Sequence, residues 1–247
     1  MSKIAVIGGT GMNQWPGLQI DQRHALDTPY GKPSAELLEG RVYGVRCVFL
    51  ARHGEGHKLP PHAINYRANI WALKRLGVSD VIAIAAVGGL ADWFAPGDVA
   101  LPDDLIDYTW GREHSYSDGR AGSKLSHVEF TQPYSPNLRK ALEAGAQEAQ
   151  ITLAGSGVMG VTQGPRLETA AEIRRMTRDG CDMVGMTGMP EAALARELEL
   201  NYACLALSVN WAAGVKGLSD IHAEIEQCIE SGMSKVRAVL EKALQKI

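Results

Sequence analysis

The chain has 247 residues, enough for one large α/β domain or two small ones. Hydrophobic residues make up 45% of it and charged residues 21%, which is typical of a compact cytosolic protein. The formal net charge of -3 argues against a nucleic-acid-binding protein, because such proteins need a basic excess to neutralise phosphates.

A strand is predicted at 4–7, a second at 42–50, and a helix at 65–76, whose apolar stripe ends at Gly77. A strand at 81–87, a polar loop at 112–124 and a surface helix at 136–149 follow. The last part of the chain predicts a strand at 157–162, a helix at 167–178, a helix from Pro190 to Leu198, a strand at 202–209 and a long helix at 220–246.

Strands that alternate with helices predict an α/β fold, with a largely parallel or mixed sheet flanked by helices. Ligands of such sheets bind at the carboxyl ends of the strands. Polar or glycine residues follow the predicted strands at several such ends, namely Thr10, Arg52-His53, Gly88-Gly89, Thr187 and Asn210. We therefore expect one shared pocket.

The N-terminal segment and the cysteines indicate a soluble, reduced protein. Only a strand's length of apolar residues follows Lys3, so neither a signal peptide nor a membrane span is expected, and the cytoplasm is the expected location. The four cysteines are widely separated and form no Cys-x-x-Cys pair. The seven histidines lack metal-ligand spacing with cysteines or acids, so no metal site is expected.

A glycine-rich turn, Gly8 to Gly11, follows the first predicted strand. Its backbone N–H groups can approach an anion, and the Thr10 hydroxyl can donate a further hydrogen bond. A dinucleotide-binding dehydrogenase is the competing interpretation. The spacing is not G-x-G-x-x-G, and Pro16-Gly17 interrupts the helix that such a fold requires, so the sequence disfavours it.

Arg52, His53 and Thr187 suit an inorganic anion. The planar guanidinium of Arg52 can bind two phosphate oxygens, and His53 can donate another hydrogen bond. Each residue also has an ordinary interpretation: a surface Arg, a solvated His, and a helix-capping Thr. Together with the glycine-rich turn they provide what a phosphate site needs.

Five motifs resemble those of the trimeric purine nucleoside and methylthioadenosine phosphorylase family. They occur in the family's order and span nearly the whole chain. They are Ile7-Gly8-Gly9-Thr10-Gly11, Leu50-Ala51-Arg52-His53-Gly54, Asn65 to Leu73, Thr162 to Arg166, and Met186 to Glu191. The resemblance implies a single α/β domain over residues 1–247, with a twisted mixed central sheet flanked by helices. It also implies a homotrimer that binds a nucleoside and phosphate.

The resemblance assigns roles to individual residues. It implies phosphate contacts at Thr10, Arg52, His53 and Thr187, with backbone help around Ala85 and Ala86. Met186 is expected to pack against ribose and base. His127 resembles a residue that reaches into the neighbouring subunit, so each pocket would be completed across a symmetric interface. Inorganic phosphate is expected as a co-substrate, with no cofactor.

The implied reaction is displacement at the anomeric carbon, with phosphate held below the sugar while the purine departs. We expect Asn210 to donate to purine N7 and Glu168 to hold the far edge of the base, within a substrate-binding stretch that includes Trp211 and Ala212. Methylthioadenosine phosphorylases carry Asp at the positions of Asn210 and Ala212. An Asn amide donates to a 6-oxo oxygen and Glu168 accepts from N1–H, which predicts 6-oxopurine specificity.

The same two residues also have ordinary interpretations, Asn210 as a strand-end cap and Glu168 as a first-turn helix acid. At the sugar 5′ end, His222 stands near the place where 5′-hydroxyl enzymes carry His, which favours inosine or guanosine. The closest branch by resemblance, methylthioinosine phosphorylases, has an apolar 5′ pocket, and His222 would then lie on the helix surface. Leu167 replaces an aromatic ring found in relatives.

Three other functions remain as alternatives: a methylthioadenosine phosphorylase, a hydrolytic nucleosidase, and a non-catalytic purine-binding protein. The set of phosphate-binding residues disfavours the hydrolase, which uses water in place of phosphate. Phosphate-dependent turnover separates these alternatives.

Overall fold

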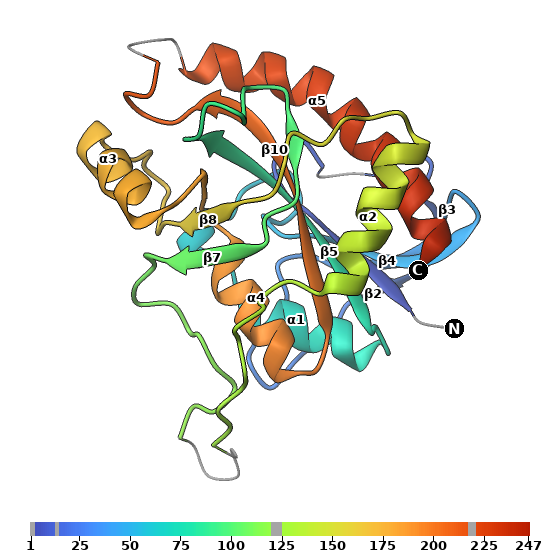
Figure 1. The fold of residues 1–247 in the computed structure, drawn as a ribbon. Coiled ribbons are helices and arrows are strands. Elements are labelled where there is room, and N and C mark those ends of the chain that lie inside the picture. Colours follow the sequence, from blue (N-terminus) through green and yellow to red (C-terminus); the bar gives the residue numbers. More distant parts are fainter. Residues whose placement is uncertain (1–2, 13–14, 120–124, 217–220) are drawn as a thin grey trace.

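The computed structural model describes residues 3–12, 15–119, 125–216 and 221–247, which form a ten-stranded sheet with helices on both faces (Figure 1). The strands are β1 (Ile4–Gly8), β2 (Gln19–His24), β3 (Leu37–Val42), β4 (Val45–Ala51), β5 (Asp80–Gly89), β6 (Val99–Ala100), β7 (Asp104–Asp107), β8 (Val158–Val161), β9 (Met183–Gly185) and β10 (Asn201–Trp211). The helices are α1 (Tyr66–Arg75), α2 (Pro136–Glu148), α3 (Ala170–Asp179), α4 (Gly188–Glu197) and α5 (Ile221–Ala243), with short 3-10 helices η1 (Pro61–Ala63) and η2 (Leu244–Lys246).

The sheet is mixed. Strand order is β2-β3-β4-β1-β5-β9-β8-β7, and β10 lies on the other side of β5. The central pairs β4–β1, β1–β5 and β5–β10 are parallel, whereas β2–β3, β3–β4, β5–β9 and β10–β6 are antiparallel. This confirms the expected α/β fold with a mixed central sheet flanked by helices; its extent as a single domain over residues 1–247 stays a prediction.

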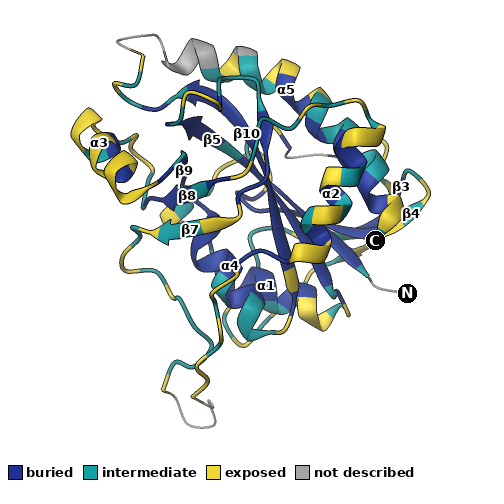
Figure 2. Cartoon of the chain, viewed as in Figure 1, coloured by how far each residue is buried: buried dark blue, intermediate teal, exposed yellow. Residues whose placement is uncertain are grey.

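The two faces of the sheet are covered by different helices, and the strands are the most buried part of the molecule (Figure 2). Ala5 and Ile7 belong to the core cluster that includes residues of α1 and α4. Ile4 and Val6 belong to the cluster that includes residues of α2 and α5. Because successive strand residues point to opposite faces, a strand buried on both sides is continuously apolar, as β1 is.

The strand predicted at 42–50 was wrong in its first part. The chain forms a hairpin instead, in which β3 and β4 are joined by Tyr43 and Gly44. Both have positive φ, 52° and 80°, as in the two-residue turns that suit a twisted hairpin. The prediction overlooked this turn because apolar residues flank it.

Other boundaries shifted by local chemistry. The helix predicted from 167 begins at Ala170, because Thr169 and Glu172 form a reciprocal capping box. Regular helical geometry in α4 begins at Pro190, as expected, since Met189 is extended. The short strands β2, β6, β7 and β9 were not predicted. Residues 112–119 form neither helix nor strand, as expected, and 120–124 lie outside the described residues.

Candidate active site

A pocket of about 400 Å³ lies at the carboxyl ends of the central strands. Strand β1 pairs with β5 only as far as Ile7 and Ala83, and β9 pairs with β5 at Gly88 and Gly89. Among the described strands, none pairs with that side of β5 between these points. The open stretch, Ile84 to Val87, lines the pocket. A break in strand pairing thus makes room for a ligand beside the backbone.

Most residues predicted from the sequence line this pocket. They are Thr10, Arg52, His53, Ala85, Ala86, Glu168, Met186, Thr187, Asn210 and Ala212. Lining residues between 165 and 213 thus meet lining residues between 9 and 88, as expected for strand ends that share one edge of a sheet.

Three predicted residues are not placed there. Trp211, the last residue of β10, is not among the residues that line the pocket. Its ring instead lies 4.9 Å from the ammonium of Lys216. His127 is exposed, on the segment that leaves the body of the protein between β7 and α2 (Figure 1). The side chain of His222 lies outside the described residues.

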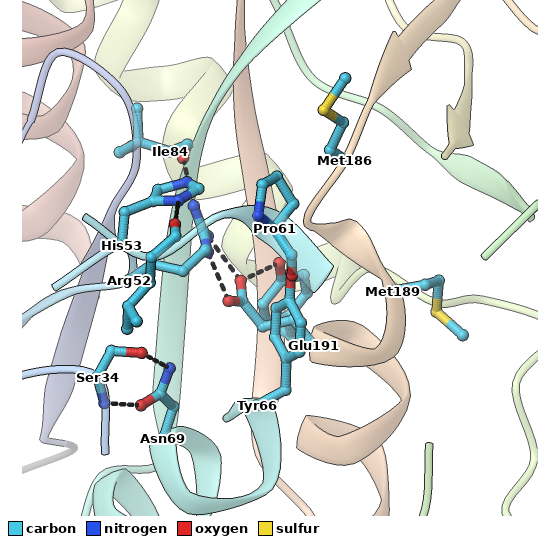
Figure 3. A network of polar contacts seen from close by, with 12 residues as sticks. Ser34, Arg52, His53, Pro61, Tyr66, Asn69, Ile84, Met186, Met189 and Glu191 are labelled. Atoms are coloured by element: carbon cyan, nitrogen blue, oxygen red, sulfur yellow. Dashed lines mark hydrogen bonds and ion pairs between the residues drawn. The ribbon is translucent and has the colours of Figure 1, made fainter. Parts of the chain in front are cut away.

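Arg52 is almost completely buried, with 1% of its surface exposed. Its Nε and Nη2 donate to the two carboxylate oxygens of Glu191 at 2.6 and 2.7 Å (Figure 3). The hydroxyl of Tyr202 donates to the same carboxylate at 2.8 Å. Burial opposes the charge of Arg52, but Glu191 outweighs it and raises the pKa of Arg52. The bidentate contact fixes the guanidinium plane.

The remaining donors of Arg52 are available at the pocket. Nη1 donates to the carbonyl of Ile84 at 3.1 Å, so three of the five N–H groups are used. A Cβ at Gly9 would lie 2.6 Å from the oxygen of Ile84 and 3.0 Å from Nη1 of Arg52. Only glycine lets the turn after β1 approach this guanidinium so closely.

His53 is held by the loop that follows it. Its Nδ1 donates to the carbonyl of Leu59 at 2.8 Å, since a carbonyl oxygen can only accept. Burial and the positive charge of Arg52 lower the pKa of His53 to about 4. The neutral ring then has a lone pair at Nε2, so donation to phosphate requires the imidazolium, which a bound anion favours. The ring of His57 stacks on it, with centroids 4.2 Å apart.

Two hydroxyl groups border the same region. Thr187 is buried and stands at the N-cap of α4, but its side chain makes no capping hydrogen bond. The ordinary interpretation of Thr187 as a capping residue therefore does not account for its hydroxyl. Thr10 is half-buried in the turn after β1. A cation, an imidazole and two hydroxyls lie around one end of the pocket, which is the chemistry of an anion site.

The other end of the pocket carries an acid and an amide. Glu168 is half-buried, and one of its oxygens accepts a hydrogen bond from the hydroxyl of Thr162 at 2.6 Å. Asn210 is buried, and its amide nitrogen donates to the carbonyl of Trp211 at 2.7 Å. A second N–H of Asn210 and the second oxygen of Glu168 remain for a ligand in the same pocket.

Sequence reasoning missed the residues that hold the others in place. Glu191 lies in a motif that was recognised, yet nothing in its spacing shows that it is fully buried against Arg52. Thr162 was likewise not assigned. Among the described residues, no three His, Cys, Asp or Glu side chains are arranged to hold a metal ion, and no helix is long and apolar enough to cross a membrane.

Comparisons with known proteins identify the family to which the chain belongs. Residues 3–245 match the model of the phosphorylase superfamily. The chain is 56% identical over 218 residues to a probable S-methyl-5′-thioinosine phosphorylase of Xanthomonas campestris pv. campestris, covering 88% of this chain and 87% of that one. It is 43% identical over 234 residues to the 6-oxopurine nucleoside phosphorylase of Pyrococcus furiosus, covering 93% and 87%.

A solved structure has the same fold. The methylthioadenosine phosphorylase of Schistosoma mansoni in complex with tubercidin superimposes with a TM-score of 0.90 at 31% identity, covering 99% of this chain and 91% of that one. The family model, the similar sequences and the solved structure each match 88% or more of the chain. The chain therefore belongs to the phosphorylase superfamily, and it is an enzyme of the nucleoside phosphorylase type.

Proposed function

We propose that this enzyme cleaves a 6-oxopurine nucleoside with inorganic phosphate, releasing the purine base and a ribose 1-phosphate or its 5-methylthio analogue. One observation carries the proposal. The acceptor Glu168 and the donor Asn210 line the same pocket as the cation Arg52 and the hydroxyl of Thr187. The pocket therefore offers a base-recognising pair and an anion site within reach of one nucleoside.

The reaction follows from this arrangement. Phosphate bound by Thr10, Arg52, His53 and Thr187 attacks the anomeric carbon as the bond from that carbon to N9 breaks, and the electron pair leaves with the purine. An N–H of Asn210 donated to N7 stabilises the developing negative charge on the base, an effect of roughly 3 kcal/mol for a well-placed donor. Because the amide gives up no proton, the purine takes its proton from solvent.

The base preference rests on hydrogen-bond polarity. A 6-oxopurine presents an N1–H donor, which the carboxylate of Glu168 accepts, and an O6 acceptor, which shares with N7 the one N–H of Asn210 that does not bind Trp211. A 6-aminopurine presents an N1 acceptor instead, which faces a carboxylate that cannot donate. Sites built on such polar contacts reject the wrong base strongly.

S-methyl-5′-thioinosine is the substrate we favour. Apolar residues beside His53 line the pocket, namely Leu59, Pro60 and Pro61, and Ile225 of α5 adds another. Such a lining suits a methylthio group. Four relatives named probable S-methyl-5′-thioinosine phosphorylase are 52–56% identical to this chain. Another relative of that name, from Methanopyrus kandleri, is 42% identical, and three named 6-oxopurine nucleoside phosphorylase or probable 6-oxopurine nucleoside phosphorylase are 42–43% identical.

The proposal includes a cytoplasmic homotrimer acting in purine salvage. The segment that carries His127 extends from the body of the protein, and the histidine itself is exposed. This is the position expected of a residue that completes a neighbouring subunit's pocket. The mass of the protein in solution checks the trimer; a monomer active at all concentrations would contradict it.

The experiment is release of free base from S-methyl-5′-thioinosine, inosine, guanosine, adenosine and methylthioadenosine, each with and without phosphate. We expect turnover only with phosphate, and the highest kcat/KM for S-methyl-5′-thioinosine. Preference for either adenine nucleoside would contradict the roles of Glu168 and Asn210. Turnover without phosphate would indicate the hydrolytic nucleosidase, and base binding without turnover a non-catalytic protein.

A further inference from the structure

Arg112 connects two loops of the active site, although it lies outside every motif of the family resemblance. It stands on the segment between β7 and α2. Its Nη2 donates to the carbonyls of Thr162 at 3.2 Å and Gln163 at 2.8 Å. Its Nη1 donates to the carbonyls of Met186 at 2.9 Å and Met189 at 2.5 Å. One guanidinium thus spans the chain after β8 and the chain after β9.

Both loops contribute residues to the lining of the pocket. The loop after β8 begins at Thr162, whose hydroxyl holds Glu168. The loop after β9 contains Met186 and Thr187. In the proposed reaction the first loop binds the base and the second borders the sugar and phosphate. The contacts of Arg112 therefore join the groups that must lie on either side of the scissile bond.

The guanidinium is well matched to this task. Its six hydrogen-bond acceptors are all neutral: four peptide carbonyls, the side-chain oxygen of Gln163 and the hydroxyl of Tyr66. It also lies 5.4 Å from the centre of the Tyr66 ring. Burial lowers the pKa of Arg112, but a guanidinium is so strong a base that the charge is retained. Hydrogen bonds from a charged donor are about twice as strong as neutral ones.

We propose that Arg112 is a positioning residue that sets the distance between base-binding Glu168 and phosphate-binding Thr187. The inference rests on the proposed function. Arg112 touches neither substrate; it acts through the peptide carbonyls next to these residues. A displacement of about 1 Å can reduce the rate on the order of 100-fold. We therefore expect loss of this connection to lower kcat/KM in variants that still fold.

The test compares Arg112→Lys and Arg112→Gly with the parent enzyme, using S-methyl-5′-thioinosine and methylthioadenosine. We expect Arg112→Gly to reduce kcat/KM for S-methyl-5′-thioinosine on the order of 100-fold and to narrow its preference over methylthioadenosine. Arg112→Lys should have a kcat/KM between those of Arg112→Gly and the parent enzyme. One ammonium group lacks the planar set of donors with which the guanidinium binds both loops. Added guanidinium, below denaturing concentrations, should restore part of the kcat of Arg112→Gly.

The matched control is Arg23→Gln, which removes an exposed cation of β2 whose ion-pair partner is Glu36. It should keep the parent kcat/KM. A folded Arg112→Gly with parental kcat/KM and base preference would overturn the inference. So would a loss of activity that guanidinium leaves unrestored while the unfolding temperature falls in parallel. If the parent enzyme itself shows no phosphorolysis, the proposed function fails instead.

Discussion

The groups that the proposed reaction assigns to phosphate and to the base, called here the phosphate end and the base end of the pocket, are built differently. At the phosphate end, Arg52, His53, Thr187 and Glu191 are all less than 9% exposed, and Arg52 is fixed by a bidentate ion pair. At the base end, Glu168 is half-buried and is held by a single hydroxyl. The neighbouring Leu167 is 40% exposed.

In the proposed reaction, one set of groups binds the phosphate that attacks, and a different set selects the base. The phosphate end follows buried strands and is ordered before any ligand arrives, so its donors need no reorganisation during the reaction. At the base end Asn210 is buried on β10, but Glu168 and Leu167 lie in the loop between β8 and α3, where substitutions are tolerated more readily. A superfamily can therefore keep one reaction with phosphate while the bases that its members accept differ.

The largest effect is expected at the ion pair that orders the phosphate end. Glu191→Gln removes the counter-charge of Arg52 and leaves a buried cation without an anionic partner. We expect a loss of about 3–5 kcal/mol in the free energy of unfolding, measured in urea at neutral pH. The KM for phosphate should rise in the fraction that stays folded.

Glu172→Gln is the control, because Glu172 pairs bidentately with Arg166 on the surface. An exposed pair contributes about 0–1 kcal/mol, and glutamine preserves the capping box of α3. If the two variants lost the same small amount of stability, the phosphate end would not be the more strongly ordered one.

The second largest effect is expected from a substitution that changes only the base end. Asn210→Asp replaces an amide that donates with a carboxylate that only accepts, so N7 and the 6-oxo oxygen lose their donor. We expect kcat/KM for S-methyl-5′-thioinosine to fall on the order of 100-fold. The KM for phosphate should stay unchanged, because none of the phosphate-binding groups depends on Asn210.

Asn137→Asp provides the same chemical change at an exposed position in the first turn of α2 and should leave the kinetics unchanged. Equal effects of Asn210→Asp on the nucleoside and on phosphate would show that the two ends are coupled. The comparison above would then be wrong.

The sequence predicted the fold class and the residues that line the pocket for one physical reason. Thr10, Arg52 and Asn210 follow apolar runs, and the carboxyl ends of parallel strands meet at one edge of a sheet. Short elements were missed, because β6 and β9 have too few residues to show a period. The turn at Tyr43-Gly44 was overlooked because apolar residues on both sides of it resemble one continuous strand.

The supporting residues were beyond sequence reasoning. Glu191 lies 139 positions from Arg52 in the chain, and Arg112 lies 50 or more positions from each carbonyl it binds. Neither spacing nor periodicity reveals such contacts. A Glu just after Pro190 in a helix is usually exposed, and only the folded chain shows this one to be buried.

The smallest effect concerns the hydroxyl that holds Glu168. Thr162→Val keeps the side-chain volume and removes the hydrogen bond to the carboxylate. A hydrogen bond to a charged group contributes about 1.5–3 kcal/mol, and about 1.4 kcal/mol is tenfold, so kcat/KM for S-methyl-5′-thioinosine should fall at least about 10-fold. Thr162→Ser, which keeps the hydroxyl, should stay near the parent value. Glu168 is held by this one hydrogen bond, whereas Arg52 is held by two from Glu191. If Thr162→Val had the kcat/KM of the parent enzyme, Glu168 would be ordered by the bound base and not by Thr162.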